Sequence, residues 1–128
     1  MTTLQSCLDD LLIRGLDDWI QAAEVASVVR TTGATTSEAA AREMALRLIR
    51  TLLDAGLCEV GMVEEQRGFI RWMDSIADSM QRIEAAWGVR PTGPDLGEVC
   101  WLSLTAEGKA QAQRLWSRKS GGDAQSSR

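Results

Sequence analysis

The chain has 128 residues, of which 45% are hydrophobic and 25% are charged, and its formal net charge is −4. This length and composition predict one globular domain with its own hydrophobic core. The sequence pI of about 4.8 argues against a nucleic-acid-binding surface, because such surfaces need an excess of Lys and Arg to contact phosphates.

The start of the chain lacks the features of a secretory signal, since it has neither a positively charged segment nor a long apolar stretch. No apolar run approaches the roughly 18 residues that a membrane span needs. Cys7, Cys58 and Cys100 are widely spaced among apolar residues, which predicts buried, reduced thiols. We therefore expect a cytoplasmic protein outside the membrane.

Two helices are predicted before the first loop. Residues 4–14 place four leucines on one face, as an amphipathic helix does. Asp17 or Asp18 can cap a second helix over about 18–31, in which Trp19 and several alanines and valines form the inner stripe. The segment that follows has no periodicity and predicts a loop.

The longest predicted helix covers about 38–55. Ser37 can cap its N-terminus, and Gly56 fits the position after its last turn, which needs a left-handed backbone. One broad face is apolar, and the other carries acidic and basic residues at the i,i+4 spacing of helical ion pairs. The expected pairs are Glu38 with Arg42, and Glu43 with Arg47.

Two strands are predicted in the second half of the chain. Residues 57–63 predict the first strand, and a polar turn follows over 64–68. Residues 69–72 suit either a short return strand or a loop that packs on the core. Residues 98–104 predict the second strand, whose two apolar faces indicate that it is covered on both sides.

A fourth helix is predicted between these strands, over 75–87. Asp74 can cap it, and Asp78 and Arg82 are expected to pair on its outer face. Both prolines of the chain lie in 89–97, which therefore cannot be the interior of a helix.

The last predicted helix covers 106–118, with Thr105 as its cap and Trp116 pointing inward. The residues from 117 to 128 are rich in Ser and Gly, which predicts a disordered tail. We therefore expect a single domain over 1–116.

Five tryptophans accompany one phenylalanine and no tyrosine. Trp72 follows Arg71 outside any clear periodicity, and an exposed Trp beside an Arg is typical of binding hot spots. A core position is the slightly favoured alternative for Trp72. The four tryptophans that fit core positions are Trp19, Trp87, Trp101 and Trp116.

Histidine is absent, which removes the commonest general base and metal ligand. The cysteines lack the CxxC spacing of zinc sites, and no glycine-rich phosphate-binding loop is present. The paired carboxylates could form a metal site, but helix capping and solvated surfaces explain them better. We therefore expect no enzyme activity, metal or cofactor. These pairs are Asp9-Asp10, Asp17-Asp18 and Glu64-Glu65.

The segments LLDAGLCEVG (52–61) and WLSLTAEGKAQAQ (101–113) resemble parts of winged-helix regulators over about half of the chain. In that family, a recognition helix ends in a Gly-Leu step before a strand, and a later strand ends in a Leu-Thr-x-x-Gly turn that starts a helix. The matching residues here are Gly56 and Leu57 in the step, and Leu104, Thr105 and Gly108 in the turn. The chain is also similar to uncharacterised small actinobacterial proteins with an Asp-Asp-Trp helix and a Glu-x-Cys-Trp strand.

The chain departs from the winged-helix pattern at the wing, which is normally a short hairpin. Here 64–97 is an excursion that holds a whole helix. We therefore predict a mainly α fold with a small antiparallel β-sheet (α+β), winged-helix-like, with a helical insertion between the strands.

The acidic excursion favours a non-enzymatic protein-binding module that docks on a partner with a basic surface. Immunity or antitoxin-type inhibitors, which block nucleic-acid-directed toxins, are one such class. The candidate partner-binding residues are Glu64, Glu65, Arg71, Trp72, Asp74 and Asp78.

The alternative is a winged-helix DNA-binding transcriptional regulator that acts as a homodimer through its first and last helices. The charges on helix 38–55 cancel, which disfavours nucleic acid. The residues assigned to DNA are Arg42, Arg47 and Arg50 at phosphates, and Thr35 or Thr36 at base edges. A third hypothesis is a small-ligand sensor with a pocket near Trp87 and Trp101.

Overall fold

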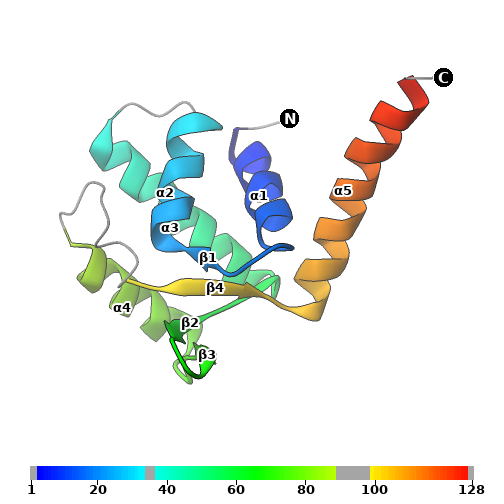
Figure 1. The fold of residues 1–128 in the computed structure, drawn as a ribbon. Helices are drawn as coiled ribbons and strands as arrows, with labels where there is room; N and C mark the ends of the chain where they lie inside the picture. The colour runs from blue at the N-terminus through cyan, green and yellow to red at the C-terminus, as the bar shows by residue number, and fades with distance from the viewer. Residues whose placement is uncertain (1–2, 34–36, 89–98, 127–128) are drawn as a thin grey trace.

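The structure, a computed structural model, describes residues 3–33, 37–88 and 99–126, with side chains described as far as residue 119. The described residues form five helices and four strands (Figure 1). This arrangement confirms the predicted α+β class. The elements are α1 (Thr3–Arg14), β1 (Ile20–Gln21), α2 (Ala22–Thr31), α3 (Glu38–Asp54), β2 (Cys58–Glu64), β3 (Gly68–Arg71), α4 (Ile76–Trp87), β4 (Trp101–Leu104) and α5 (Ala106–Ser126).

The four strands form one antiparallel sheet in the order β1-β4-β2-β3. Leu102 of β4 pairs with Ile20 of β1 on one side and with Val60 of β2 on the other. These three residues are buried and define the inner face of the sheet. The predicted helical insertion is α4, which lies between β3 and β4 along the chain.

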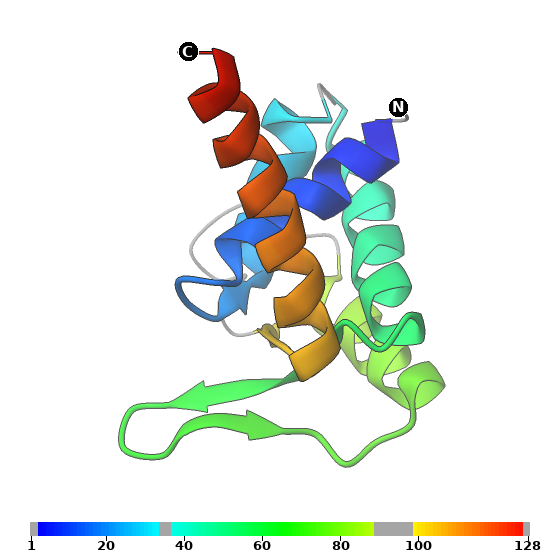
Figure 2. The same cartoon turned by 90° about the vertical axis from the view of Figure 1, so that its right-hand side faces the viewer.

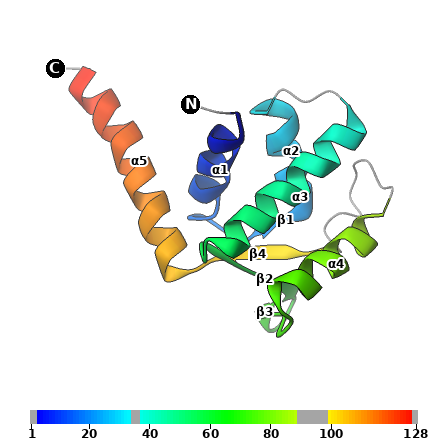
Figure 3. The ribbon, with the colours of Figure 1, turned by 180° about the vertical axis from the view of Figure 1, so that it is seen from behind.

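The hydrophobic core lies between the inner face and the helices. The largest fully buried helical side chains come from α1 to α4, and α5 contributes the fully buried Ala112. The helix α4 lies beside α3 in two opposite views (Figures 1 and 3). The helix α5 packs against α1, and its C-terminal end points away from the other helices (Figure 1). The largest fully buried helical side chains are Leu11, Leu12, Val25, Val28, Leu48, Ile49, Leu52, Ile83 and Trp87. None of the described helices is long and apolar enough to span a bilayer.

The predicted helix over 18–31 begins later, at Ala22, because the residues before it join the sheet. The backbone N–H of Trp19 donates to Asp18 Oδ1 at 2.7 Å, and the chain then extends so that β1 pairs with β4. Asp17 and Asp18 therefore do not cap α2, whose N-cap is Gln21 without a side-chain hydrogen bond. A two-residue strand is too short to leave a periodic signal.

The other helix ends follow local capping chemistry. Ser37 caps α3 as predicted, since its side chain accepts a hydrogen bond from Ala40 N at 3.3 Å. Gly56 has the expected left-handed backbone, with φ at 71°. The cap of α4 is Ser75 rather than Asp74, because Ser75 Oγ accepts from Asp78 N at 3.1 Å.

Two of the three expected helical ion pairs are replaced by longer-range contacts. Glu38 pairs with Arg30 at 3.3 Å, so it does not pair with Arg42. Arg82 pairs with Asp74 at 3.3 Å instead of with Asp78. No Glu43–Arg47 pair is present in the described part of the chain. Exposed i,i+4 pairs contribute only a few tenths of a kcal/mol, so tertiary contacts override them easily.

The last helix is longer than predicted, since α5 continues to Ser126 instead of ending at 118. The segment 117–128 was expected to be disordered, but it is helical as far as Ser126. The domain boundary expected at 116 therefore falls within a helix. After Gly108, no glycine or proline interrupts the chain until Gly121, so nothing in the sequence stops the helix at 118.

The tryptophans range from fully buried to exposed, and Trp72 and Trp101 are partly buried. Trp87 is 0% exposed, which confirms its predicted core position. Trp19 is 37% exposed and Trp116 is 52% exposed, so the core prediction is wrong for both. Trp19 instead stacks on Phe69 of β3, with ring centroids 6.3 Å apart. Because it precedes a strand and not a helix, Trp19 lies on the outer face of the sheet.

Candidate functional site

The β2–β3 hairpin and the start of α4 carry a continuous run of mostly exposed residues, from Glu64 to Asp78. The hairpin extends away from the helices, and the chain then turns back into α4 (Figure 2). Residues 69–72, for which a strand and a loop were both considered, include a return strand that pairs with β2. All six candidate partner-binding residues lie in this unit. We call the exposed charged and large apolar residues between positions 64 and 78 the hairpin–α4 surface, which comprises Glu64, Glu65, Arg67, Arg71, Met73, Asp74, Ile76 and Asp78.

The junction between β3 and α4 exposes apolar side chains. Met73 is 83% exposed, and Ile76 is 38% exposed. They account for two of the four large hydrophobic side chains that are exposed among the described residues. Sequence analysis missed Met73 because it lies between a strand and a helix, where no periodicity distinguishes an inner from an outer position.

The carboxylates of this surface fall into two groups. Glu64 pairs with Arg67 at 3.7 Å, and Asp74 pairs with Arg82 at 3.3 Å. Glu65 and Asp78 are exposed, and neither forms an ion pair within the described residues. The negative charge available to a partner is therefore concentrated on Glu65 and Asp78.

Arg71 and Trp72 support this surface from the two faces of the hairpin. Arg71 pairs with Glu59 at 3.5 Å across the strands. Trp72 is partly buried against the core, and the Arg82 guanidinium lies 3.9 Å from the centre of its ring. This geometry is a cation–π contact. Trp72 therefore takes the core position, and Met73 beside it is the exposed apolar residue.

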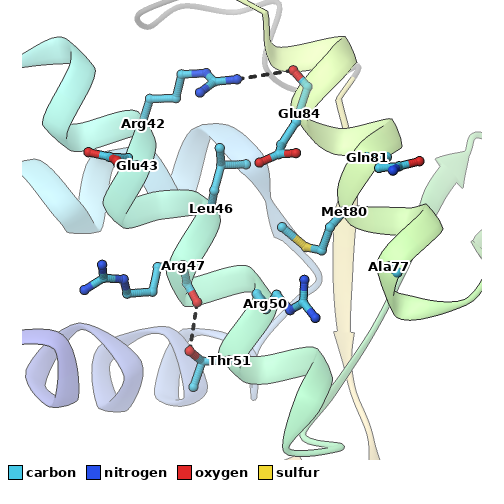
Figure 4. A pocket seen from close by; sticks show the side chains of 10 residues that line it. All are labelled: Arg42, Glu43, Leu46, Arg47, Arg50, Thr51, Ala77, Met80, Gln81 and Glu84. Carbon is cyan, nitrogen blue, oxygen red and sulfur yellow. Dashed lines mark hydrogen bonds between the residues drawn. The ribbon is translucent and has the colours of Figure 1, made fainter.

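The arginines assigned to DNA line a groove of about 580 Å³ between α3 and α4 (Figure 4). Arg42 donates from Nε to the carbonyl oxygen of Gly88 at 2.8 Å, and from its terminal nitrogen to that of Glu84 at 3.4 Å. Arg42 therefore binds the carbonyl group of Gly88, the C-cap residue of α4, and shares the carbonyl oxygen of Glu84 with Gly88 N, which donates to it at 3.0 Å.

The remaining DNA candidates are less constrained. Arg50 pairs with Asp54 at 3.3 Å, whereas Arg47 is exposed and has no ion pair within the described residues. Thr35 and Thr36 lie outside the described residues. The helix α4 lies beside α3, and its carbonyl oxygens accept the hydrogen bonds of Arg42. One side of the candidate recognition helix is therefore already covered by protein.

No protein-family model, curated protein or solved structure matches this chain. The resemblance to winged-helix regulators therefore depends on the capping residues and on the order of the elements.

The cysteines are unsuited to nucleophilic chemistry. Burial raises the pKa of both Cys58 and Cys100 to about 12, and it is also the main cause of a raised pKa at Cys7. A thiol with a raised pKa stays protonated at neutral pH and is a poor nucleophile. Within the described ranges, no three Cys, Asp or Glu side chains are placed to hold a metal ion.

The adjacent carboxylates at the start of the chain have structural partners. Asp10 accepts from Arg14 Nε and from Thr32 Oγ1, both at 2.8 Å, and so links α1 to the end of α2. Asp9 accepts from Gln5 at 2.8 Å. These bonds agree with the structural explanation of the pair.

We predict that Arg42→Ala lowers the free energy of unfolding by about 1–2 kcal/mol, because two charge-assisted hydrogen bonds to the end of α4 are lost. Urea denaturation monitored by circular dichroism measures this change. Arg47→Ala, on the same helix, is the matched control and is expected to change stability by less than about 0.5 kcal/mol. Equal effects of the two substitutions would contradict the capping role of Arg42.

Proposed function

We propose that this chain is a non-enzymatic protein-binding module that docks a partner with a basic surface on the hairpin–α4 surface. The observation that supports this most is the exposure of Met73 and Ile76 beside the unpaired carboxylates of Glu65 and Asp78. An apolar centre with a charged rim is the usual organisation of a specific protein interface.

The two parts of this surface make different contributions to binding. Met73 and Ile76 supply apolar area whose removal from water stabilises a complex. Glu65 and Asp78 supply negative charge, which speeds the encounter with a positive surface and excludes partners of the wrong charge. Inhibitors that cover the nucleic-acid-binding surface of a toxin need this combination. We therefore propose the immunity or antitoxin type as the class of module.

Several features support a protein partner over DNA. The net charge is −4, and Arg42 and Arg50 of the candidate recognition helix are bound within the molecule. A DNA-binding helix needs positive side chains that are free to reach phosphates. We also propose the cytoplasm as the compartment, since Cys7, Cys58 and Cys100 are free thiols.

The first experiment is capture of the tagged chain from a lysate of its own host, with and without nuclease, followed by purification of any stoichiometric protein partner.

We predict that the double substitution Glu65→Lys/Asp78→Lys weakens binding to that partner by at least about tenfold, or about 1.4 kcal/mol, and reduces its salt dependence. Calorimetric titration at low and high salt measures both effects.

The matched control is Asp17→Lys/Glu107→Lys, which makes the same change in net charge at two exposed positions on other elements. Asp17 lies in a loop, as Glu65 does, and Glu107 lies in the first turn of a helix, as Asp78 does. Equal losses from both double variants would contradict a localised site. Met73→Ser tests the apolar part of the surface and is expected to weaken binding without changing the salt dependence.

Capture also distinguishes the alternative function. Recovery of particular DNA fragments that disappear after nuclease treatment would favour a DNA-binding regulator that acts as a dimer. In that case, Arg47→Ala should weaken duplex binding. Of the three arginines assigned to DNA, Arg47 is the one whose side chain forms no ion pair or hydrogen bond within the described residues.

A further inference from the structure

The strand β3 is the last strand of the sheet, and no described strand pairs with its outer side. The hydrogen bond of Trp72, whose N–H donates to Val60 O at 2.9 Å, shows which backbone groups near β3 point toward β2. Because backbone groups alternate along an antiparallel strand, Ile70 also bonds inward to β2. The backbone N–H and C=O groups of Phe69 and Arg71 therefore point outward.

These outward groups can pair with the same groups on a second copy of the chain. If two β3 strands lie antiparallel with a two-fold axis at Ile70, Phe69 of each copy lies opposite Arg71 of the other. Both pairs are of the hydrogen-bonded type, so each exchanges two backbone hydrogen bonds. The Arg71 guanidinium of one copy then lies beside the Phe69 ring of the other, which is a favourable cross-strand pair.

The neighbouring registers are less favourable for electrostatic reasons. An axis at Arg71 would place the two Arg71 side chains opposite each other. An axis at Phe69 would place Arg67 opposite Arg71. Like charges directly opposite each other destabilise a strand pair, so the axis at Ile70 is the preferred register.

The surroundings of β3 permit such an approach. The hairpin extends away from the helices, and no described helix or strand lies beyond the outer side of β3 (Figure 2). Trp19 stacks on Phe69 and holds its ring on the outer face of the sheet. Ile70 is partly exposed, so at the axis the two Ile70 side chains would remove apolar surface from water.

We propose that two copies of this chain associate through their β3 strands, edge to edge, into one continuous antiparallel sheet. This interface shares Arg71 with the hairpin–α4 surface, but it goes beyond the proposed function because its occupant is a second copy and its contacts are mainly backbone hydrogen bonds. Each copy carries a net charge of −4, so screening by salt should strengthen self-association. Binding of a basic partner should show the opposite dependence on salt.

The first test uses the unaltered chain without any partner. Sedimentation velocity over a concentration series should show a monomer–dimer equilibrium that shifts toward the dimer as salt rises. Amide hydrogen exchange by NMR should show protection at Phe69 and Arg71 that increases with concentration, while Ile70 is protected throughout. A monomer at every concentration, or unchanged exchange at Phe69 and Arg71, would overturn the proposal.

The second test removes an edge donor. Arg71→Pro deletes an N–H that points away from β2, so the hairpin keeps its internal hydrogen bonds. We expect this variant to remain folded by circular dichroism and to sediment as a monomer. The matched control Arg71→Val keeps the N–H and should still dimerise, with weaker affinity. A dimer that survives Arg71→Pro would have its interface elsewhere and would overturn the proposal.

Discussion

Replacing Trp87 with alanine is expected to lower the free energy of unfolding by about 3–5 kcal/mol, the range for deleting a large buried aromatic side chain. Trp87 is the last residue of α4 and is 0% exposed, and Ile83 one turn earlier is also fully buried. These two residues hold the inserted helix against the core. Because small domains have only about 5–15 kcal/mol of stability, this single loss would leave the fold marginal.

Urea denaturation followed by circular dichroism measures this effect, and two variants calibrate it. Trp116→Ala deletes the same side chain from a position that is 52% exposed, so we expect a change within about 0.5 kcal/mol. Trp87→Phe keeps most of the buried volume and removes an indole N–H that has no partner among the described residues, so its cost should stay below about 1.5 kcal/mol. Equal effects of the two alanine substitutions would show that α4 is not anchored through Trp87.

Replacing Gly108 with alanine is expected to lower the free energy of unfolding by about 2–3 kcal/mol, even though alanine is the better helix former. A Cβ atom at this position would lie 2.0 Å from the carbonyl oxygen of Leu57. That oxygen also accepts the hydrogen bond from Thr105 N at 3.0 Å, so it cannot move away without loss. The clash is with backbone, and it exceeds the gain in helix propensity.

The matched control is Gly56→Ala, at the residue that precedes Leu57. There the added Cβ would meet no atom within 4 Å, but the backbone is left-handed, with φ at 71°. We expect a cost of about 1 kcal/mol from backbone conformation alone. Thermal denaturation of both variants separates the two causes. A Gly108→Ala protein as stable as the original chain would contradict the close approach of α5 to Leu57.

The sequence predicted the elements whose signals are local. The long helix expected over 38–55 is observed over Glu38–Asp54, because its apolar face, its Ser37 cap and its Gly56 stop agree with one another. The helix inside the excursion was predicted to within one residue of α4. Thr105 caps α5 as expected, since Gly108 N donates to Thr105 Oγ1 at 3.0 Å.

The contacts that sequence analysis missed depend on residues far apart in the chain. Arg42 was expected to pair with Glu38, but it reaches the end of α4 at Gly88, which periodicity within one helix cannot indicate. The β1 strand exists because β4 pairs with it. Within the candidate site, the carboxylates were found from their composition, whereas the exposure of Met73 required the three-dimensional path from β3 into α4.

The central position of β4 determines the order in which the sheet can assemble. The β2–β3 hairpin closes over the turn at 65–67, so it can form from local contacts within microseconds. The β4 strand, by contrast, must reach partners as distant as Ile20, and such non-local pairing is slow. During synthesis, β1 and β2 therefore remain without the strand that joins them until Leu104 has left the ribosome. Until then, the facing edges of both strands are open to pairing with other chains, so aggregation should be most pronounced before β4 is in place.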